Sequence, residues 1–291
     1  MVKHDSKYHA VKYVSEELNF TITLLCEIID LNRSSYYKWL KRKTSKNDLE
    51  NETVLDTILD IHKEVKGIYG YRRLTMNVNR KLNKSYNTKR IYRLIKLLKI
   101  ECVIRRKRKK YIRSKPQHVA ENILSRKFSA SVPNEKWLTD LTEFKYGKGK
   151  KAYLSAILDL YDNSIVAYNL GNSNNNELVF TNLDIALKSV KGTKPLIHSD
   201  RGYQYTSNGF KRKINEAGMT QSMSRVGKCI DNGPMEGFFG ILKCEKYYLN
   251  KYDNYLDLEK DIEDYIKFYN NKRLQKKLNC QSPVEFRAMA A

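Results

Sequence analysis

The sequence predicts an α/β domain over residues 133–291, preceded by an all-helical front region. Within residues 1–104 apolar side chains recur at helical spacing, whereas beyond Pro133 short strand-like runs alternate with helical segments. A dense basic run at residues 105–110 lies between the two parts and is too charged to bury. We therefore divide the chain into a helical region (1–48), a second helical domain (49–104), a basic linker (105–132) and a core (133–291).

The composition favours a folded protein that works in a reducing compartment. With 291 residues, 41% of them hydrophobic, the chain is long enough to build two or more domains with a sizeable core. Its five cysteines show no metal-ligand spacing, which argues against a zinc site. The sequence contains no long apolar run and no signal-peptide pattern at its start, so we expect a cytoplasmic protein with reduced thiols.

The positive charge is concentrated in the front half. The formal net charge is +23, and residues 1–130 hold 31 Lys and Arg against 13 Asp and Glu. Residues 131–291 hold 24 against 19. An excess of this size attracts polyanions and drives phosphate binding by counterion release, so we predict a nucleic-acid partner. A basic protein that is merely soluble is the alternative.

The first helical region reads as two helices joined by a tight turn. The apolar positions are Ile22, Leu25, Cys26 and Ile29, followed by Tyr36, Trp39 and Leu40. Ser34 or Ser35 is the expected N-cap of the second helix. A DNA-binding helix-turn-helix and a plain helical hairpin have the same periodicity, and both interpretations remain open.

The second helical domain has a sharper pattern. We expect Thr88 to cap a helix whose apolar face is formed by Ile91, Leu94, Ile95 and Leu98. The predicted DNA-binding side chains are Lys89, Arg93 and Lys96 on its opposite face, Arg72 and Arg73 in the preceding helix, and Arg105, Arg106 and Arg108 in the linker. A solvated basic face is the alternative for the helix.

The core is predicted element by element. Strands are expected at residues 137–144, 151–161 and 165–170, a helix at about 177–190, a short strand at 194–200, a helix at 210–217, a strand at 219–224, a helix opened by Pro234, and a final helix through 258–269. Tight turns join the first three strands, which makes them neighbours in an antiparallel arrangement.

Three carboxylates occupy positions suited to a shared metal site. Asp140 lies within the first strand, and Asp200 ends the short strand. Glu236 lies just after Pro234, and 35 residues separate it from Asp200. Hard divalent cations prefer oxygen ligands, and a pair of such ions can activate an attacking oxygen and stabilise the leaving oxygen of a phosphodiester. The spacing indicates a polynucleotidyl transferase with Asp140, Asp200 and Glu236 as catalytic residues and metal ligands. The competing acids are Glu143, Asp159, Asp162 and Asp231.

Residues near the three carboxylates receive supporting roles. Lys243 shares a helix face with Glu236, away from the apolar stripe, where it would contact nucleic acid. His198 is either a general base or a histidine that supports the neighbouring Asp200, and we favour the supporting role. Asn232 is assigned a supporting role beside the carboxylates as well. Turn or capping roles are expected for Asp162 and Asp231.

Several motifs resemble transposases of bacterial insertion sequences of the IS-three group, specifically the second-reading-frame product. They are NEKWLTDLT (134–142), HSDRGYQY (198–205), SMSR (222–225), DNGPMEGFFGILK (231–243), YNNKR (269–273) and SPVEF (282–286). The resemblance covers nearly the whole chain. Two positions depart from it: Cys280 stands where glycine is expected, and residues 275–277 stand where many relatives carry a histidine.

The resemblance implies an RNase H-like, integrase-type core with a mixed sheet flanked by helices. It implies that Asp140, Asp200 and Glu236 form the catalytic triad with two Mg²⁺ or Mn²⁺ ions, and that Lys243 contacts the DNA end. Residues 52–110 resemble the helix-turn-helix module that precedes such cores.

In function, the resemblance implies a DNA transposase that binds terminal inverted repeats and catalyses strand cleavage and strand transfer into target DNA. We expect a homo-oligomer on double-stranded DNA, a nucleoid-associated location in the bacterial cytosol, and a frameshift fusion with an upstream product as a further form. A catalytically silent DNA-binding regulator and an RNase H-like nuclease are the alternatives.

Overall fold

The computed structural model describes residues 5–41, 45–104, 120–190, 192–225 and 229–289. They form two compact units, one within residues 1–60 and one within 61–291. The basic run at 105–110 lies outside the described residues, so the DNA contacts of Arg105, Arg106 and Arg108 stay predictions. None of the described helices combines the length and the apolar character needed to cross a bilayer.

The first unit is helical. Its elements are α1 (Asp5–Leu18), α2 (Ile22–Ile28), α3 (Arg33–Leu40) and the first part of α4 (Lys46–Glu64). Tyr8 of α1 packs with Cys26 and Tyr36, and its ring stacks on Trp39 at a centroid distance of 5.4 Å. The helix α1 was not predicted. The expected serine cap of α3 was wrong, because Asn32 caps it by accepting a hydrogen bond from the backbone N–H of Ser35.

Helices α5 (Tyr71–Leu82) and α6 (Thr88–Leu97) belong to the second unit. Ile91, Leu94 and Ile95 are buried, which confirms most of the predicted apolar face of α6. The N-cap is Asn87, not Thr88, because the Asn87 side chain accepts a hydrogen bond from the N–H of Lys89 at 2.8 Å. Both cap errors have the same origin, since each helix begins one residue after an asparagine in extended conformation.

The core is built on one five-stranded sheet. Its strands are β1 (Lys136–Tyr146), β2 (Lys150–Asp159), β3 (Ile165–Gly171), β4 (Leu196–Ser199) and β5 (Thr220–Met223), in the order β3-β2-β1-β4-β5. The first three are antiparallel, as predicted, whereas β4 runs parallel to β1 and β5 parallel to β4. The sheet is therefore mixed, with β1 at its centre.

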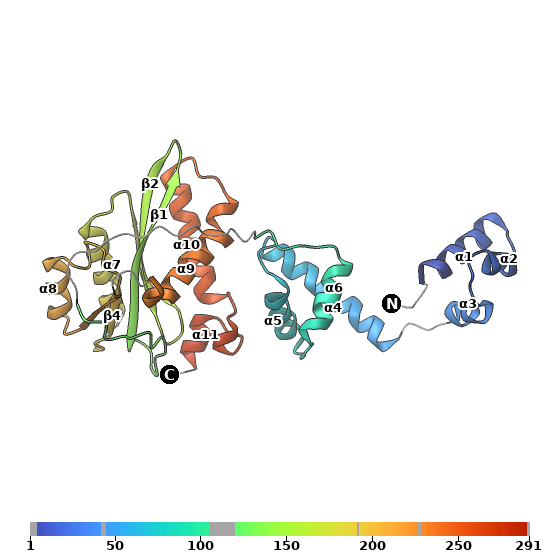
Figure 1. The fold of residues 1–291 in the computed structure, drawn as a ribbon, viewed down its shortest axis with the longest axis horizontal. Coiled ribbons are helices and arrows are strands. Elements are labelled where there is room, and N and C mark those ends of the chain that lie inside the picture. Colours follow the sequence, from blue (N-terminus) through green and yellow to red (C-terminus); the bar gives the residue numbers. More distant parts are fainter. Residues whose placement is uncertain (1–4, 42–44, 105–119, 191, 226–228, 290–291) are drawn as a thin grey trace. The chain divides into compact units, whose positions relative to one another are not determined.

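Helices cover both faces of the sheet (Figure 1). One layer contains α7 (Asn176–Ser189) and α8 (Asn208–Glu216), and the other contains α9 (Gly233–Glu245) and α10 (Tyr255–Asn271). Alternate strand residues serve the two layers: Trp137 and Ile157 pack with α7 and α8, while Leu138 and Leu158 pack with α9 and α10. Four short helical segments complete the described core: Cys229–Asn232, Tyr247–Leu249, Lys276–Leu278 and α11 (Pro283–Ala288).

Part of the segment that the sequence assigned to a linker rests on the core. Leu124 is buried in the cluster beneath α9 and α10, and its backbone N–H donates to Ser222 Oγ at 3.1 Å. The Asn122 amide donates to Asp231 Oδ2 at 3.0 Å. Residues 120–128 therefore contact the segment just ahead of α9, the helix that carries Glu236.

Candidate active site

Asp140 and Asp200 become neighbours through the register of the central strands. Thr139 of β1 pairs with Ser199 of β4 in a parallel ladder, and each aspartate is the next residue along its strand direction. Adjacent strands lie about 4.8 Å apart, so the two side chains emerge beside each other at the same end of the ladder. Asn232 brings in the third carboxylate, because its amide Nδ2 donates to the Thr139 carbonyl at 3.3 Å just ahead of α9.

The three carboxylates influence one another electrostatically. Burial raises the pKa of Asp140 well above its ordinary value, and the nearby charges of Asp200 and Glu236 raise it further. Burial also raises the pKa of Asp200, while its hydrogen bond from the Gly202 N–H acts in the opposite direction. The structure thus brings Asp140, Asp200 and Glu236, predicted from spacing, into one electrostatic cluster.

Local backbone contacts orient the two aspartates. Asp140 Oδ1 accepts a hydrogen bond from the N–H of Leu141 at 2.7 Å, and Asp200 Oδ1 accepts one from the N–H of Gly202 at 2.8 Å. A β-carbon at position 202 would lie 3.0 Å from Asp200 Oδ1. Glycine at this position therefore lets the chain turn closely around the carboxylate.

The residues present fit a divalent cation. In the described ranges, no group of three or more His, Cys, Asp or Glu side chains is arranged to hold a metal ion as it stands. Nevertheless, a cation would relieve the repulsion that raises the pKa of Asp140, and carboxylate oxygens are the ligands that Mg²⁺ prefers. The Asn232 Oδ1 atom is buried without a hydrogen-bond partner, which leaves one more oxygen acceptor beside β1. The donor set is thus all oxygen.

Lys243 lies beside the strand that carries Asp140. Its ammonium donates a hydrogen bond to Thr142 Oγ1 at 2.6 Å and lies 5.2 Å from the centre of the Phe144 ring. Its charge lowers the pKa of Asp140, against the larger effects of burial and of Asp200. The Lys243 ammonium group therefore lies on the same side of α9 as Glu236, two turns further along the helix.

His198 occupies a buried position. Its ring nitrogens lie 2.9 Å from Ser222 Oγ and 3.1 Å from Ser224 Oγ, so two serines of the β5 region satisfy both. Burial lowers the pKa of His198 to about 4, against a smaller opposing effect of Asp231. A neutral imidazole with a hydrogen bond at each ring nitrogen supports the sheet next to Asp200. This favours the supporting role over that of a general base.

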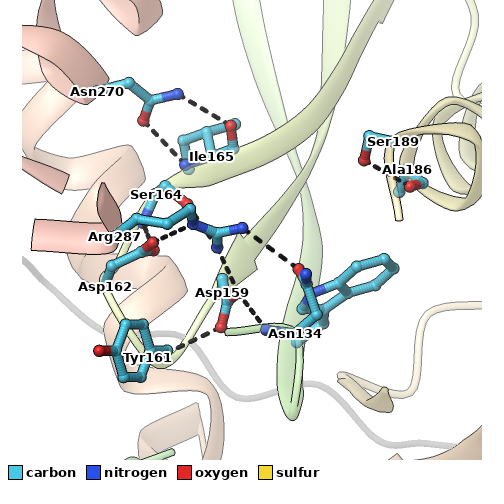
Figure 2. A network of polar contacts seen from close by, with 11 residues as sticks. Asn134, Asp159, Tyr161, Asp162, Ser164, Ile165, Ala186, Ser189, Asn270 and Arg287 are labelled. Atoms are coloured by element: carbon cyan, nitrogen blue, oxygen red, sulfur yellow. Dashed lines mark hydrogen bonds and ion pairs between the residues drawn. The ribbon is translucent and has the colours of Figure 1, made fainter. Parts of the chain in front are cut away.

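Basic side chains hold the four competing acids. Asp231 is fully buried and accepts hydrogen bonds from Arg225 and Arg126. Asp159 and Asp162 both bind Arg287 of α11 (Figure 2). Glu143 pairs with Lys151 at 3.0 Å. These pairings give each acid a structural role, and the Arg225–Asp231–Arg126 clamp is one that sequence reasoning missed.

The predicted DNA-binding side chains divide into two groups. Arg72, Lys89, Arg93 and Lys96 are exposed. Arg73 instead turns inward, where its guanidinium binds Glu245 at 3.1 Å and lies over the Tyr69 ring. Sequence patterns could not distinguish it from Arg72, because its partner is 172 residues away.

Family models match most of the chain. A model described as an HTH-like domain matches residues 48–108. Two models described as an integrase core domain match residues 130–229 and 236–290. The second of these begins at Glu236, the residue that α9 brings to the aspartates.

Over most of its length the chain is similar to transposases of insertion sequences. The chain is 38% identical over 264 residues to the putative transposase InsK for insertion sequence element IS150 of Escherichia coli (strain K12), which covers 90% of this chain and 92% of that protein. It is 27% identical over 284 residues to transposase InsF for insertion sequence IS3A of the same organism, covering 95% and 98%. A solved HTLV-2 integrase catalytic core domain in complex with magnesium is 20% identical, with a TM-score of 0.44, covering 54% of this chain and 98% of that one.

The family models place an HTH-like domain ahead of an integrase core in this chain, and the relatives are transposases of insertion sequences. The chain belongs to the insertion-sequence transposases of the IS-three group, with an HTH-like domain ahead of an RNase H-like integrase core.

Proposed function

We propose that this protein is a DNA transposase that cleaves and joins DNA strands at the ends of an insertion sequence. The observation that carries the proposal is the convergence of Asp140, Asp200 and Glu236 at one end of the central strands of an integrase core. A helical domain with an exposed basic face precedes that core and supplies the grip on DNA.

The three carboxylates would hold two Mg²⁺ or Mn²⁺ ions. Such ions, when bound, supply charge that stabilises the attacking and leaving oxygens of a phosphodiester. The protein contributes orientation: the N–H groups of Leu141 and Gly202 hold Asp140 and Asp200, and the Asn232 amide fastens the start of α9 to β1. Burial, followed by repulsion from Asp200, raises the pKa of Asp140, and bound cations would balance both effects.

Lys243 would bind the phosphate backbone next to the reacting bond. Its ammonium sits at Thr142 on the carboxylate side of α9, where a cation attracts the substrate's negative charge. In the front region, Arg72, Lys89, Arg93 and Lys96 would contact the terminal inverted repeats. The linker residues Arg105, Arg106 and Arg108 would add further phosphate contacts.

The assembly that performs the reaction would be a homo-oligomer on double-stranded DNA, because two ends must be held together for joining. We propose a location in the bacterial cytosol, at the nucleoid. The frameshift fusion with an upstream product stays a prediction.

The test is DNA cleavage by a Glu236→Gln variant. We expect this variant to lose metal-dependent cleavage of a terminal-repeat duplex by at least about 100-fold, since it removes one ligand charge from the site. DNA binding should persist. The matched control is Glu216→Gln, which makes the same chemical change on an exposed position of α8.

Retained cleavage by Glu236→Gln would remove this residue from the proposed triad. DNA binding by the wild type without cleavage would instead favour a regulator, and cleavage without joining would favour a nuclease.

A further inference from the structure

A large groove lies between helix α5 and the loop that follows α10. Its volume is about 1320 Å³. One part of its lining begins at Gly70, at the start of α5, and another part comes from residues 273–281. Small-molecule pockets usually measure about 300–1,000 Å³, so a groove of this size is better matched to a segment of a macromolecule. Both positions that depart from the family motifs, Cys280 and residues 275–277, line it.

The groove is strongly basic. Seven of its lining residues are Arg or Lys, and Glu285 is its one acidic residue. Three of the arginines form ion pairs with two carboxylates: Arg73 and Arg273 bind Glu245, and Arg80 binds Glu285. Within the described residues no carboxylate pairs with the other four, which are Arg72, Lys84, Lys276 and Lys277. All four are exposed, so their positive charge faces the groove and solvent.

Ion pairs hold the two walls of the groove together. Arg73 of α5 binds Glu245 of α9 at 3.1 Å, and Arg80 of α5 forms two hydrogen bonds to the Glu285 carboxylate. Glu245 is itself buried, with only 4% of its side chain exposed. The walls belong to one compact unit, so the groove is a composite surface of the HTH-like domain and the integrase core.

The groove is distinct from the carboxylate site. Ile241 of α9 lines the groove, whereas Lys243 of the same helix contacts β1. Side chains two positions apart on a helix point about 200° apart, so these two face opposite sides of α9. A ligand in the groove would therefore lie behind the catalytic helix.

We propose that this groove binds the phosphate backbone of duplex DNA, with Lys276 and Lys277 of the core acting together with Arg72 and Lys84 of the HTH-like domain. The proposal rests on the proposed function, which makes DNA the polyanion present. The charge favours phosphate, the size favours a polymer, and one wall is the domain matched as HTH-like. The two departures at 275–277 and Cys280 thus lie in a DNA-binding loop.

The test is the salt dependence of binding to a fluorescein-labelled mixed-sequence duplex. Each lost phosphate contact lowers the log–log slope by about 0.9, so Lys276→Gln/Lys277→Gln should reduce it by about 2. The control variant Lys188→Gln/Lys211→Gln removes two exposed lysines from α7 and α8 and should leave the slope unchanged.

A second readout uses the natural cysteines. Cys280 is exposed in the groove, and Cys102 is exposed but outside its lining. In the wild type, DNA should slow the alkylation of Cys280 several-fold relative to that of Cys102. In the Lys276→Gln/Lys277→Gln variant, DNA should not slow the alkylation of Cys280. If the double variant binds DNA with an unchanged salt slope, and DNA does not protect Cys280 in the wild type, the groove proposal is overturned while the proposed function stands. If the wild type binds no DNA at all, the proposed function is overturned as well.

Discussion

Asp140 and Asp200 show how one backbone register produces a reactive site. Sixty residues apart in sequence, they meet because β1 and β4 pair in parallel with Thr139 opposite Ser199. Burial raises the pKa of both carboxyls, and the charge of Asp200 raises the pKa of Asp140 further, which expresses the cost of bringing two negative charges together. A site that is strained without cations is suited to bind them.

Cys280 is strained for a different reason. Asn279 and Cys280 have φ angles of +52° and +60°, in the left-handed region that favours glycine. The expectation of glycine at position 280 therefore has a backbone reason, although the side chain here is cysteine. The Cys280 N–H still donates to the Gln275 carbonyl at 3.1 Å, which closes the loop.

We predict that Cys280→Gly stabilises the protein. Relief of a left-handed non-glycine residue is worth about 1 kcal/mol, partly offset by the flexibility that glycine adds to the unfolded chain. The free energy of unfolding, measured with urea, should rise. Cys280→Ala removes the thiol but keeps the β-carbon, so it should show no such gain; equal effects of both variants would refute the backbone explanation.

Among the elements, α9 is fixed at both ends. Its start is tied to β1 by Asn232, and its last residue, Glu245, accepts hydrogen bonds from Arg273 and from the hydroxyl of Tyr265. Glu236 and Lys243 lie between these anchors. The helix is thus held rigidly where it presents one acid and one cation to the site.

The C-terminal helix α11 is anchored by a buried polar network (Figure 2). The Arg287 guanidinium binds Asp162 and contacts Asp159 Oδ2 at 2.5 Å, and both carboxylates are 0% exposed. The Asn134 N–H donates to Asp159 at 2.7 Å. One arginine therefore joins α11, the turn after β2 and the entry to β1.

Arg287→Met should destabilise the protein by about 3 kcal/mol, because it leaves two buried carboxylates without their cation. Chemical denaturation of the purified variant would measure this. As a control, Arg212→Met breaks an exposed pair with Glu216 on α8 and should have little effect. Similar small effects of both substitutions would show that the network contributes no stability.

The contact between α5 and α11 should depend on pH. The hydrogen bond from Arg80, with help from Ser282, lowers the pKa of Glu285 from 4.5 to about 2. A lowered pKa means that the stabilisation is present above about pH 4.5 and is lost as the pH falls towards 2. Solvent screens this pair, since Arg80 and Glu285 are 53% and 36% exposed.

The measurement compares the wild type with Arg80→Gln by urea unfolding at about pH 6 and about pH 3. We expect the wild type to be more stable than the variant at the higher pH, and the difference to shrink at the lower one. A difference that stays constant between the two pH values would show that Glu285 titrates normally.

For the whole molecule, periodicity predicted most of the core. The strand-like runs of β1, β2 and β3, and the apolar stripes of α9 and α10, are local patterns that packing preserved. The three carboxylates were singled out by their spacing and by the motifs around them, which carry the resemblance. Sequence reasoning made β1, β2 and β3 neighbours but did not place β4 in the sheet, since the parallel pairing of β1 with β4 depends on contacts about 60 residues apart.

Contacts between distant charges were not predictable. Arg73 has the sequence surroundings of an exposed basic residue, yet Glu245 draws it inward. The pairing of Arg287 with Asp159 and Asp162 spans more than 120 residues and leaves no periodic signal. The helix α1 was missed because its apolar residues, such as Tyr8 and Val11, are few among polar neighbours.

The central claim is that Asp140, Asp200 and Glu236 act together in strand transfer. The most direct measurement is joining of a labelled terminal-repeat duplex to target DNA in Mg²⁺ or Mn²⁺, for the wild type, Asp200→Asn and the exposed control Asp264→Asn. We predict metal-dependent joining by the wild type and the control, and none by Asp200→Asn. Joining by Asp200→Asn at the wild-type rate would contradict the account.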